Sequence, residues 1–204
     1  MIPGRILGFV IALATLPALA QSNLSPEALV RKITDDVLET VRNDKALQAG
    51  DREKALALAE QKVLPHIDFR EAAQLAVGRS WNTATPQQQE RLVAEFRAML
   101  VRIYSNAIGT YRGQTLRVFP VKMAPGDTEA TVRNQYLSPG KPPVAVDYSM
   151  RKTPDGWKVY DIVVENVSLV ITYRAEFDQV MRKSGVDGLI KRMSEKNRPA
   201  VRTG

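Results

Sequence analysis

Apolar residues in the first half of the chain recur at helical spacing. Ser25-Pro26 is typical of a helix start, and apolar residues then follow at every fourth position: Leu29, Ile33, Val37 and Val41. This spacing predicts an amphipathic helix with one buried face. A second helix is expected over 51–63, and a shorter one from Asp68 to Gly78.

The broadest apolar face belongs to a long helix predicted over 86–111. Thr85 precedes Pro86 as a capping residue, and Gln88 stands at the capping-box position. Apolar positions then continue over roughly seven turns. A face of this kind is more often ordinary core than the wall of a ligand site, and the pattern alone leaves both interpretations open.

After Gly113 the apolar period changes from helical to two, which is typical of strands. Four strands are predicted, separated by turn sequences rich in proline and glycine: 115–123, 128–137, 144–151 and 157–170. Short connections favour antiparallel neighbours. A final helical section is expected from Tyr173 to Lys196, with a break at Ser184-Gly185. Helices, then strands, then helices predict an α+β fold.

The N-terminus has the pattern of a secretory signal peptide. A short basic start is followed by an apolar run from Ile6 to Ala20, ending in the cleavage sequence Ala18-Leu19-Ala20. We therefore expect 1–20 to be removed, a single domain over 21–196 and a flexible basic tail over 197–204. A retained membrane anchor is the alternative, although the run is short for a membrane span.

The charge balance is basic, with 29 Lys and Arg against 22 Asp and Glu. Removal of Arg5 with the leader leaves 28 against 22, a surplus of +6. Such a surplus favours anionic surfaces, including phospholipid headgroups and acidic proteins, but it is equally typical of a well-solvated basic surface. Export argues against nucleic acid as a partner.

The chain offers little for catalysis. It has no cysteine and a single histidine, His66, so thiolate chemistry is excluded and histidine-based metal sites or nucleophile pairs are disfavoured. Asp161 and Glu165 lie four apart and form the one carboxylate pair considered for acid–base work. We favour salt bridges to arginine for both. The sequence therefore predicts a protein that is not an enzyme and needs no cofactor.

Several segments together resemble the MlaC family, also called the toluene-tolerance auxiliary family, of periplasmic phospholipid carriers. They occur in family order across nearly all of the chain after the leader: Val63 to Phe69, Ala76-Val77-Gly78 with Trp81, Ala84 to Gln88, Tyr111 to Gln114, Trp157 to Asp161 with Val167-Ser168-Leu169, Tyr173-Arg174, and Gly185 to Ile190. Asn166 departs from the pattern, because glycine is expected before Val-Ser.

The resemblance implies a highly twisted, mostly antiparallel four-stranded sheet wrapped by about six to seven helices and enclosing an apolar cavity. It also implies a periplasmic shuttle that carries diacyl phospholipid between an outer-membrane lipoprotein–porin complex and an inner-membrane ABC transporter with an MCE-domain ring. Two acyl chains of roughly thirty methylenes represent on the order of 20–25 kcal/mol of transfer free energy. The chains must therefore be enclosed.

We expect the cavity between the long helix and the sheet. The helix side is predicted to contribute Leu92, Phe96, Leu100, Ile103, Tyr104 and Ile108. The sheet side is predicted to contribute Val146, Tyr148, Val164, Val167 and Leu169, with Leu75 and Val77 closing one end. Arg112 and Arg174 are candidates for the lipid phosphate, and pairing with carboxylates is the alternative. An exported adaptor with a filled core and an enzyme acting on a small apolar substrate remain the rival functions.

Overall fold

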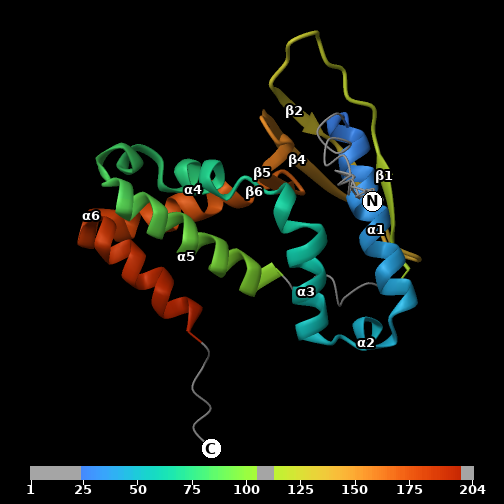
Figure 1. Ribbon diagram of the computed structural model, residues 1–204, viewed down its shortest axis with the longest axis horizontal. Helices are drawn as coiled ribbons and strands as arrows, with labels where there is room; N and C mark the ends of the chain where they lie inside the picture. The colour runs from blue at the N-terminus through green and yellow to red at the C-terminus, as the bar shows by residue number, and fades with distance from the viewer. Residues whose placement is uncertain (1–23, 105–112, 199–204) are drawn as a thin grey trace, which may run out of the picture.

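The computed structural model describes residues 24–104 and 113–198. It has a helical half beside a half built from a sheet and the N-terminal helices (Figure 1). The predicted leader, the end of the predicted long helix and most of the predicted tail lie outside the described residues. Within the described residues, the helices are α1 (Pro26–Asn43), α2 (Lys45–Gln48), α3 (Arg52–Lys62), α4 (Phe69–Val77), α5 (Pro86–Tyr104) and α6 (Leu169–Asn197), with 3-10 turns η2 (Leu64–His66) and η3 (Gly78–Thr83).

Local side-chain contacts explain where the helices begin. The Ser25 hydroxyl accepts from the Ala28 amide at 3.2 Å and starts α1. Thr85 and Gln88 exchange side-chain to backbone hydrogen bonds of 2.9 and 3.2 Å at the start of α5, a reciprocal capping box. Asp68 caps α4 through the Glu71 amide. These predicted helix starts are confirmed.

The sheet confirms the predicted α+β class but has six described strands where four were predicted. The strands are β1 (Thr115–Val118), β2 (Glu129–Val132), β3 (Asn134–Leu137), β4 (Val144–Thr153), β5 (Gly156–Val164) and β6 (Val167–Ser168). All strand pairs are antiparallel, in the order β1-β3-β4-β5-β6, with β2 also paired to β4. The predicted strand 128–137 is divided at Arg133 into β2 and β3, which follow the same edge of β4.

The predicted strand 157–170 is too long, because the chain reverses inside it. Glu165 and Asn166 have φ values of 48° and 66°, and this pair of left-handed residues joins β5 to β6. Asparagine tolerates this conformation better than most non-glycine residues. The backbone therefore explains both the expected glycine and the asparagine found there. Helix α6 begins directly after β6.

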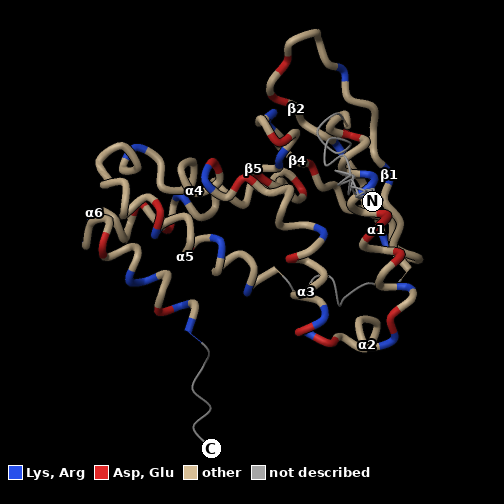
Figure 2. Tube along the Cα trace, in the orientation of Figure 1, with Lys and Arg blue, Asp and Glu red and all other residues tan. Residues whose placement is uncertain are grey.

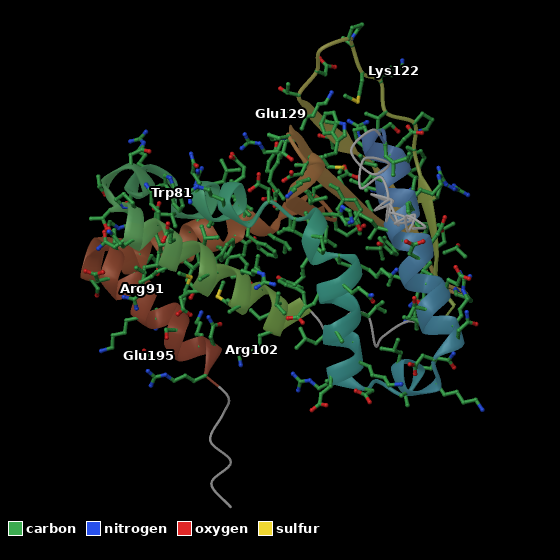
Figure 3. All side chains as sticks on the ribbon, viewed as in Figure 1. Trp81, Arg91, Arg102, Lys122, Glu129 and Glu195 are labelled. Carbon is green, nitrogen blue, oxygen red and sulfur yellow. The ribbon has the colours of Figure 1, made fainter. Side chains whose placement is uncertain are left out.

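The helical half has a solid core formed by α4, α5 and α6. Phe96 of α5 packs edge-on against Tyr173 and Phe177 of α6, with ring centroids 5.4 and 5.6 Å apart. Helix α6 turns back on itself at Gly185, whose φ is 64°, near the predicted break. Figure 3 shows Trp81 in this half, where the Arg70 guanidinium lies 5.5 Å from the centre of its ring.

The other half has two smaller cores, one at each end of α1. Near the start of the helix, Leu29 and Val30 pack with Trp157 and other residues of the sheet. Near its end, Val41 packs with Leu47 and with α3 residues. Helix α1 is therefore anchored at both ends.

Charged positions of both signs are interspersed along the described trace (Figure 2). Arg151 of β4 pairs with Glu71 of α4 and lies 3.9 Å from Asp68, which links the sheet to the helical half. Within 24–104 and 113–198, none of the helices combines the length and the apolar character that crossing a membrane requires.

Candidate functional site

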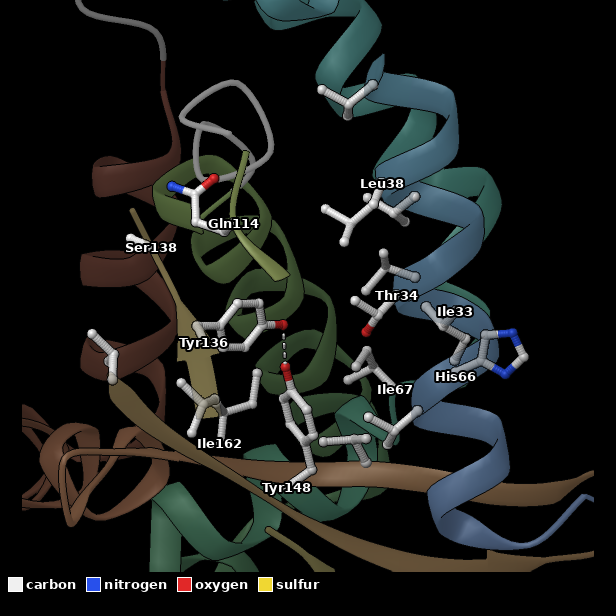
Figure 4. Close-up of a pocket in the computed structure, with 17 residues that line it drawn as sticks. Ile33, Thr34, Leu38, His66, Ile67, Gln114, Tyr136, Ser138, Tyr148 and Ile162 are labelled. Carbon is white, nitrogen blue, oxygen red and sulfur yellow. Dashed lines mark hydrogen bonds between the residues drawn. The ribbon is translucent and has the colours of Figure 1, made fainter. Parts of the chain in front are cut away.

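A pocket of about 490 Å³ lies between α1 and the sheet (Figure 4). Helix α1, the end of α3 with η2, and strands β3, β4 and β5 form its walls. Its lining is mostly aliphatic: Val30, Ile33, Thr34, Val37, Leu38, Val41, Val63, His66, Ile67, Gln114, Tyr136, Ser138, Val144, Val146, Tyr148, Val159 and Ile162. The volume lies within the range of about 300–1,000 Å³ that is usual for ligand pockets.

The α1 wall follows from the spacing of apolar residues along that helix. Residues three and four apart lie on one helix face, which places Ile33, Val37 and Val41 in line toward the sheet. Val41 is fully buried, whereas Ile33 and Val37 are only partly buried. The apolar stripe between the two anchored ends of α1 is therefore left facing a hollow.

A β-bulge arranges the sheet wall. Ser149 is opposite Asp161 and the next residue, Met150, is opposite Val159, so Tyr160 is an extra residue in β5. Because of this insertion, Val159 and Ile162 both line the pocket although they are three positions apart. Strand β4 contributes Val146 and Tyr148, which lie two apart on one face.

The hydroxyls of Tyr136 and Tyr148 meet inside this apolar pocket at 2.9 Å (Figure 4). Burial, followed by the proximity of Tyr136, raises the pKa of Tyr148 well above its ordinary value. The Tyr148 side chain is half-buried, and it forms part of the pocket lining. The Tyr148 phenol is therefore a neutral hydrogen-bonding group at physiological pH.

His66 lies in the pocket wall at the end of η2. Burial lowers the pKa of its imidazole below 6.5, and the charges of Lys158 and Lys32 act in the same direction. The neutral imidazole is therefore favoured. Nowhere in 24–104 or 113–198 do three metal-ligating side chains gather at one point.

Of the predicted cavity residues that the structure describes, two line the pocket, Val146 and Tyr148. Val164 is the strand partner of Val146 but is not part of the lining. Val167 is 57% exposed at the chain reversal, and Leu169 is the first residue of α6. Ile108 lies outside the described residues.

The other predicted cavity residues belong to the helical half. Leu92, Phe96 and Val77 are buried in its core, and Leu75 and Leu100 pack against that core. Ile103 and Tyr104 are 44% and 41% exposed near the end of α5. The pocket was expected between the long helix and the sheet, but the structure places it beneath α1.

The physical reason is that α6 folds back over α5. Its aromatic residues fill the space that the α5 face was predicted to enclose. The α1 and η2 residues were not predicted as site residues. The regular stripe of α1 was visible in the sequence and was interpreted as the buried face of an amphipathic helix, because periodicity does not distinguish a filled face from a hollow one.

The predicted charged candidates have structural partners. Asp161 accepts hydrogen bonds from the Ser168 hydroxyl at 2.6 Å and from the Val170 amide at 3.1 Å, so it helps to cap α6. Glu165 accepts from the Ala145 amide at 2.5 Å. Within the part of the chain that the structure describes, these two carboxylates bind a hydroxyl and backbone amides of the β5–β6 hairpin region, where arginine partners were predicted.

Of the two arginines considered for phosphate binding, one is described. Arg174 donates from Nε to the Leu75 carbonyl at 2.9 Å. A Cβ built on Gly78 would lie 3.3 Å from the same nitrogen, so Arg174 is packed against the end of α4. Arg112 lies outside the described residues.

Comparison with known proteins decides the family. A sequence model of the MlaC protein family matches residues 31–195. This chain belongs to the MlaC family. The predicted resemblance is confirmed, and the family match includes every residue of the pocket lining except Val30.

Relatives of this MlaC-family chain match nearly its full length. It is 22% identical over 193 residues to the intermembrane phospholipid transport system binding protein MlaC of Haemophilus influenzae, covering 93% of this chain and 90% of the relative. It is 25% identical to the toluene tolerance protein ttg2D of Pseudomonas putida, covering 88% and 84%. A structure of the phospholipid-binding protein from Ralstonia solanacearum, in complex with a phospholipid, is 39% identical with a TM-score of 0.78, covering 85% of this chain and 97% of that one.

Proposed function

We propose that this protein binds phospholipid and transports it through the periplasm, with acyl chains held in the pocket beneath α1. The observation that carries the proposal is the pocket of about 490 Å³ lined mainly by aliphatic side chains. Family membership and the phospholipid complex of the Ralstonia protein support the same ligand class. No catalytic step and no cofactor is part of this proposal.

The energetics of the pocket suit this ligand. Burying roughly fourteen methylenes of one acyl chain contributes on the order of 11 kcal/mol at about 0.8 kcal/mol each. Such binding requires enclosure and few polar contacts, and it selects weakly among headgroups. Release then requires an acceptor that offers the acyl chains another apolar environment.

The proposal extends to the route of transport. An inner-membrane ABC transporter complex with an MCE-domain ring and an outer-membrane lipoprotein–porin complex are the partners we expect at the two membranes. A leader removed after Ala20 would deliver the chain to the compartment between them.

Lipid extraction and native mass spectrometry of the protein purified from the periplasm test the first part. The expected result is a mass shift equal to a diacyl phospholipid that organic extraction removes. A protein that carries no lipid and takes none from phospholipid vesicles would contradict the proposal and favour an adaptor with no lipid ligand.

Transfer between vesicles tests the second part. Labelled phospholipid loaded on the protein should pass to vesicles containing the reconstituted ABC complex faster than to vesicles without it. Equal transfer rates would be consistent with lipid binding but would contradict the proposed shuttle to the ABC complex.

A further inference from the structure

We infer that the paired hydroxyls of Tyr136 and Tyr148 donate a hydrogen bond to an acyl-ester carbonyl, which makes the pocket selective for ester-linked over ether-linked phospholipid. The inference rests on the proposed function and deepens it. It assigns to two residues a specificity that hydrocarbon burial alone does not provide, because apolar contacts do not distinguish an ester from an ether.

The two tyrosine hydroxyls hold more hydrogens than the bond between them uses. Two phenol hydroxyls carry two hydrogens, and the 2.9 Å bond between them uses one. No further hydrogen bond joins either hydroxyl to another residue within 24–104 and 113–198. Whichever tyrosine donates within the pair, the other has a hydrogen left, and both side chains line the pocket.

The remaining hydroxyl hydrogen determines which group a ligand must offer to the pair. A purely hydrocarbon segment against the pair would leave that hydrogen unpaired in an apolar environment, which is unfavourable. Ester carbonyl oxygens are neutral acceptors attached directly to the acyl chains. The phosphate is a poorer match, because the described pocket lining contains no Lys or Arg to accompany a buried anion.

The two tyrosines come from neighbouring strands of the sheet. Tyr136 lies on β3 and Tyr148 on β4, and these strands are antiparallel neighbours through the Tyr136–Val144 pair. Figure 4 shows the two rings pointing toward each other from the sheet side, with Thr34 of α1 across the pocket. Because strands hold their side chains in fixed positions, the donor is preorganised. It therefore sets how far an acyl chain enters the pocket.

The test compares two lipids that differ only in the linkage. Delipidated protein is titrated with diester and diether phospholipids that have the same headgroup and the same chain lengths. We expect the diester to bind the unaltered protein about twofold to tenfold more tightly, as one neutral hydrogen bond provides. The double variant Tyr136→Phe with Tyr148→Phe should bind both lipids and lose the preference.

Tyr160→Phe is the matched control. Tyr160 lies on the adjacent strand β5 but is outside the pocket lining, so removal of its hydroxyl should leave the ester preference intact. An infrared measurement on the unaltered protein is independent of any variant's folding. The stretching frequency of a carbon-13 labelled ester carbonyl in the bound lipid should be lower than that of the same ester in a dry apolar solvent, because a hydrogen bond lowers the carbonyl stretching frequency.

The outcomes separate this inference from the proposed function. Equal binding of both lipids by the unaltered protein, a preference that persists in the double variant, or a carbonyl frequency typical of a dry, unbonded ester would each overturn the role of the tyrosine pair while leaving lipid binding in place. Failure of both lipids to bind would overturn the proposed function, and the inference with it.

Discussion

Val37 is one of the apolar α1 side chains that line the pocket, one helical turn from both Ile33 and Val41. Changing it to Glu would place a carboxylate among aliphatic groups with no Lys or Arg in the described lining. Since burial of an unpaired charge is strongly unfavourable, we expect at least about tenfold less bound phospholipid in native mass spectrometry.

Val167→Glu is the matched control for this prediction. Val167 carries the same side chain but is 57% exposed at the β5–β6 reversal. Its charge would be solvated, so lipid loading should be unchanged. A loss of loading in Val167→Glu with normal loading in Val37→Glu would show that the cavity predicted from the sequence, and not the pocket beneath α1, holds the lipid.

His66 makes the stability of the fold dependent on pH. Because its folded pKa is lowered below 6.5, the unfolded chain binds more protons between the folded value and 6.5. Stability contributed by the neutral imidazole is therefore present above about pH 6.5 and is lost as the pH falls below it. Thermal unfolding should show a smaller decrease between pH 7 and pH 5 in His66→Gln than in the unaltered protein. An equal decrease in both proteins would contradict this assignment.

At the scale of elements, the start of α6 depends on the hairpin before it. Asp161 binds the Ser168 hydroxyl and the backbone amides of Ile162 and Val170. Asp161→Ala leaves these donors without their acceptor. We expect it to lower the free energy of unfolding by about 1–3 kcal/mol in denaturant titrations.

Asp155→Ala provides the comparison, because it removes a carboxylate of the β4–β5 turn that is 79% exposed and pairs only loosely with Lys158 at 3.5 Å. Exposed pairs of this kind contribute little, so the change should stay within about 0.5 kcal/mol. Similar decreases in the free energy of unfolding for both variants would contradict the capping role of Asp161.

The elements also show where sequence patterns succeed and fail. Helix starts were predictable because a capping residue and the amide it binds are three residues apart, as in Ser25 and Ala28. The end of the last predicted strand could not be predicted in this way. Glu165 and Asn166 are ordinary polar residues, and their left-handed backbone depends on the β5–β6 pairing. The bulge at Tyr160 was missed for the same reason.

For the whole molecule, the separation of a filled helical core from a hollow sheet half predicts a divided response to ligand. In the proposed binding mode, lipid contacts the half that contains α1, η2 and the sheet. Ligand binding stabilises the native state by mass action, by about 2.7 kcal/mol at a hundredfold excess over Kd. Local openings within the pocket walls should be suppressed most.

Amide hydrogen exchange of the loaded and delipidated protein checks this expectation. Protection should increase for α1 and for β4 and β5, and it should change little for α5 and the second half of α6. A uniform increase over both halves would indicate that the two behave as one cooperative unit. An increase confined to α5 would place the lipid in the helical half.

The sequence by itself determined the α+β order, the helix starts and the family, because these depend on local spacing and on residue type. Only the tertiary structure decided which apolar face is filled and which is hollow. The stripes on α1 and α5 look alike as patterns. Helix α6 supplies Tyr173 and Phe177 to cover α5. Helix α1 instead packs against the sheet near its start and against α2 and α3 near its end, so the pocket forms beneath the stretch between these two contacts.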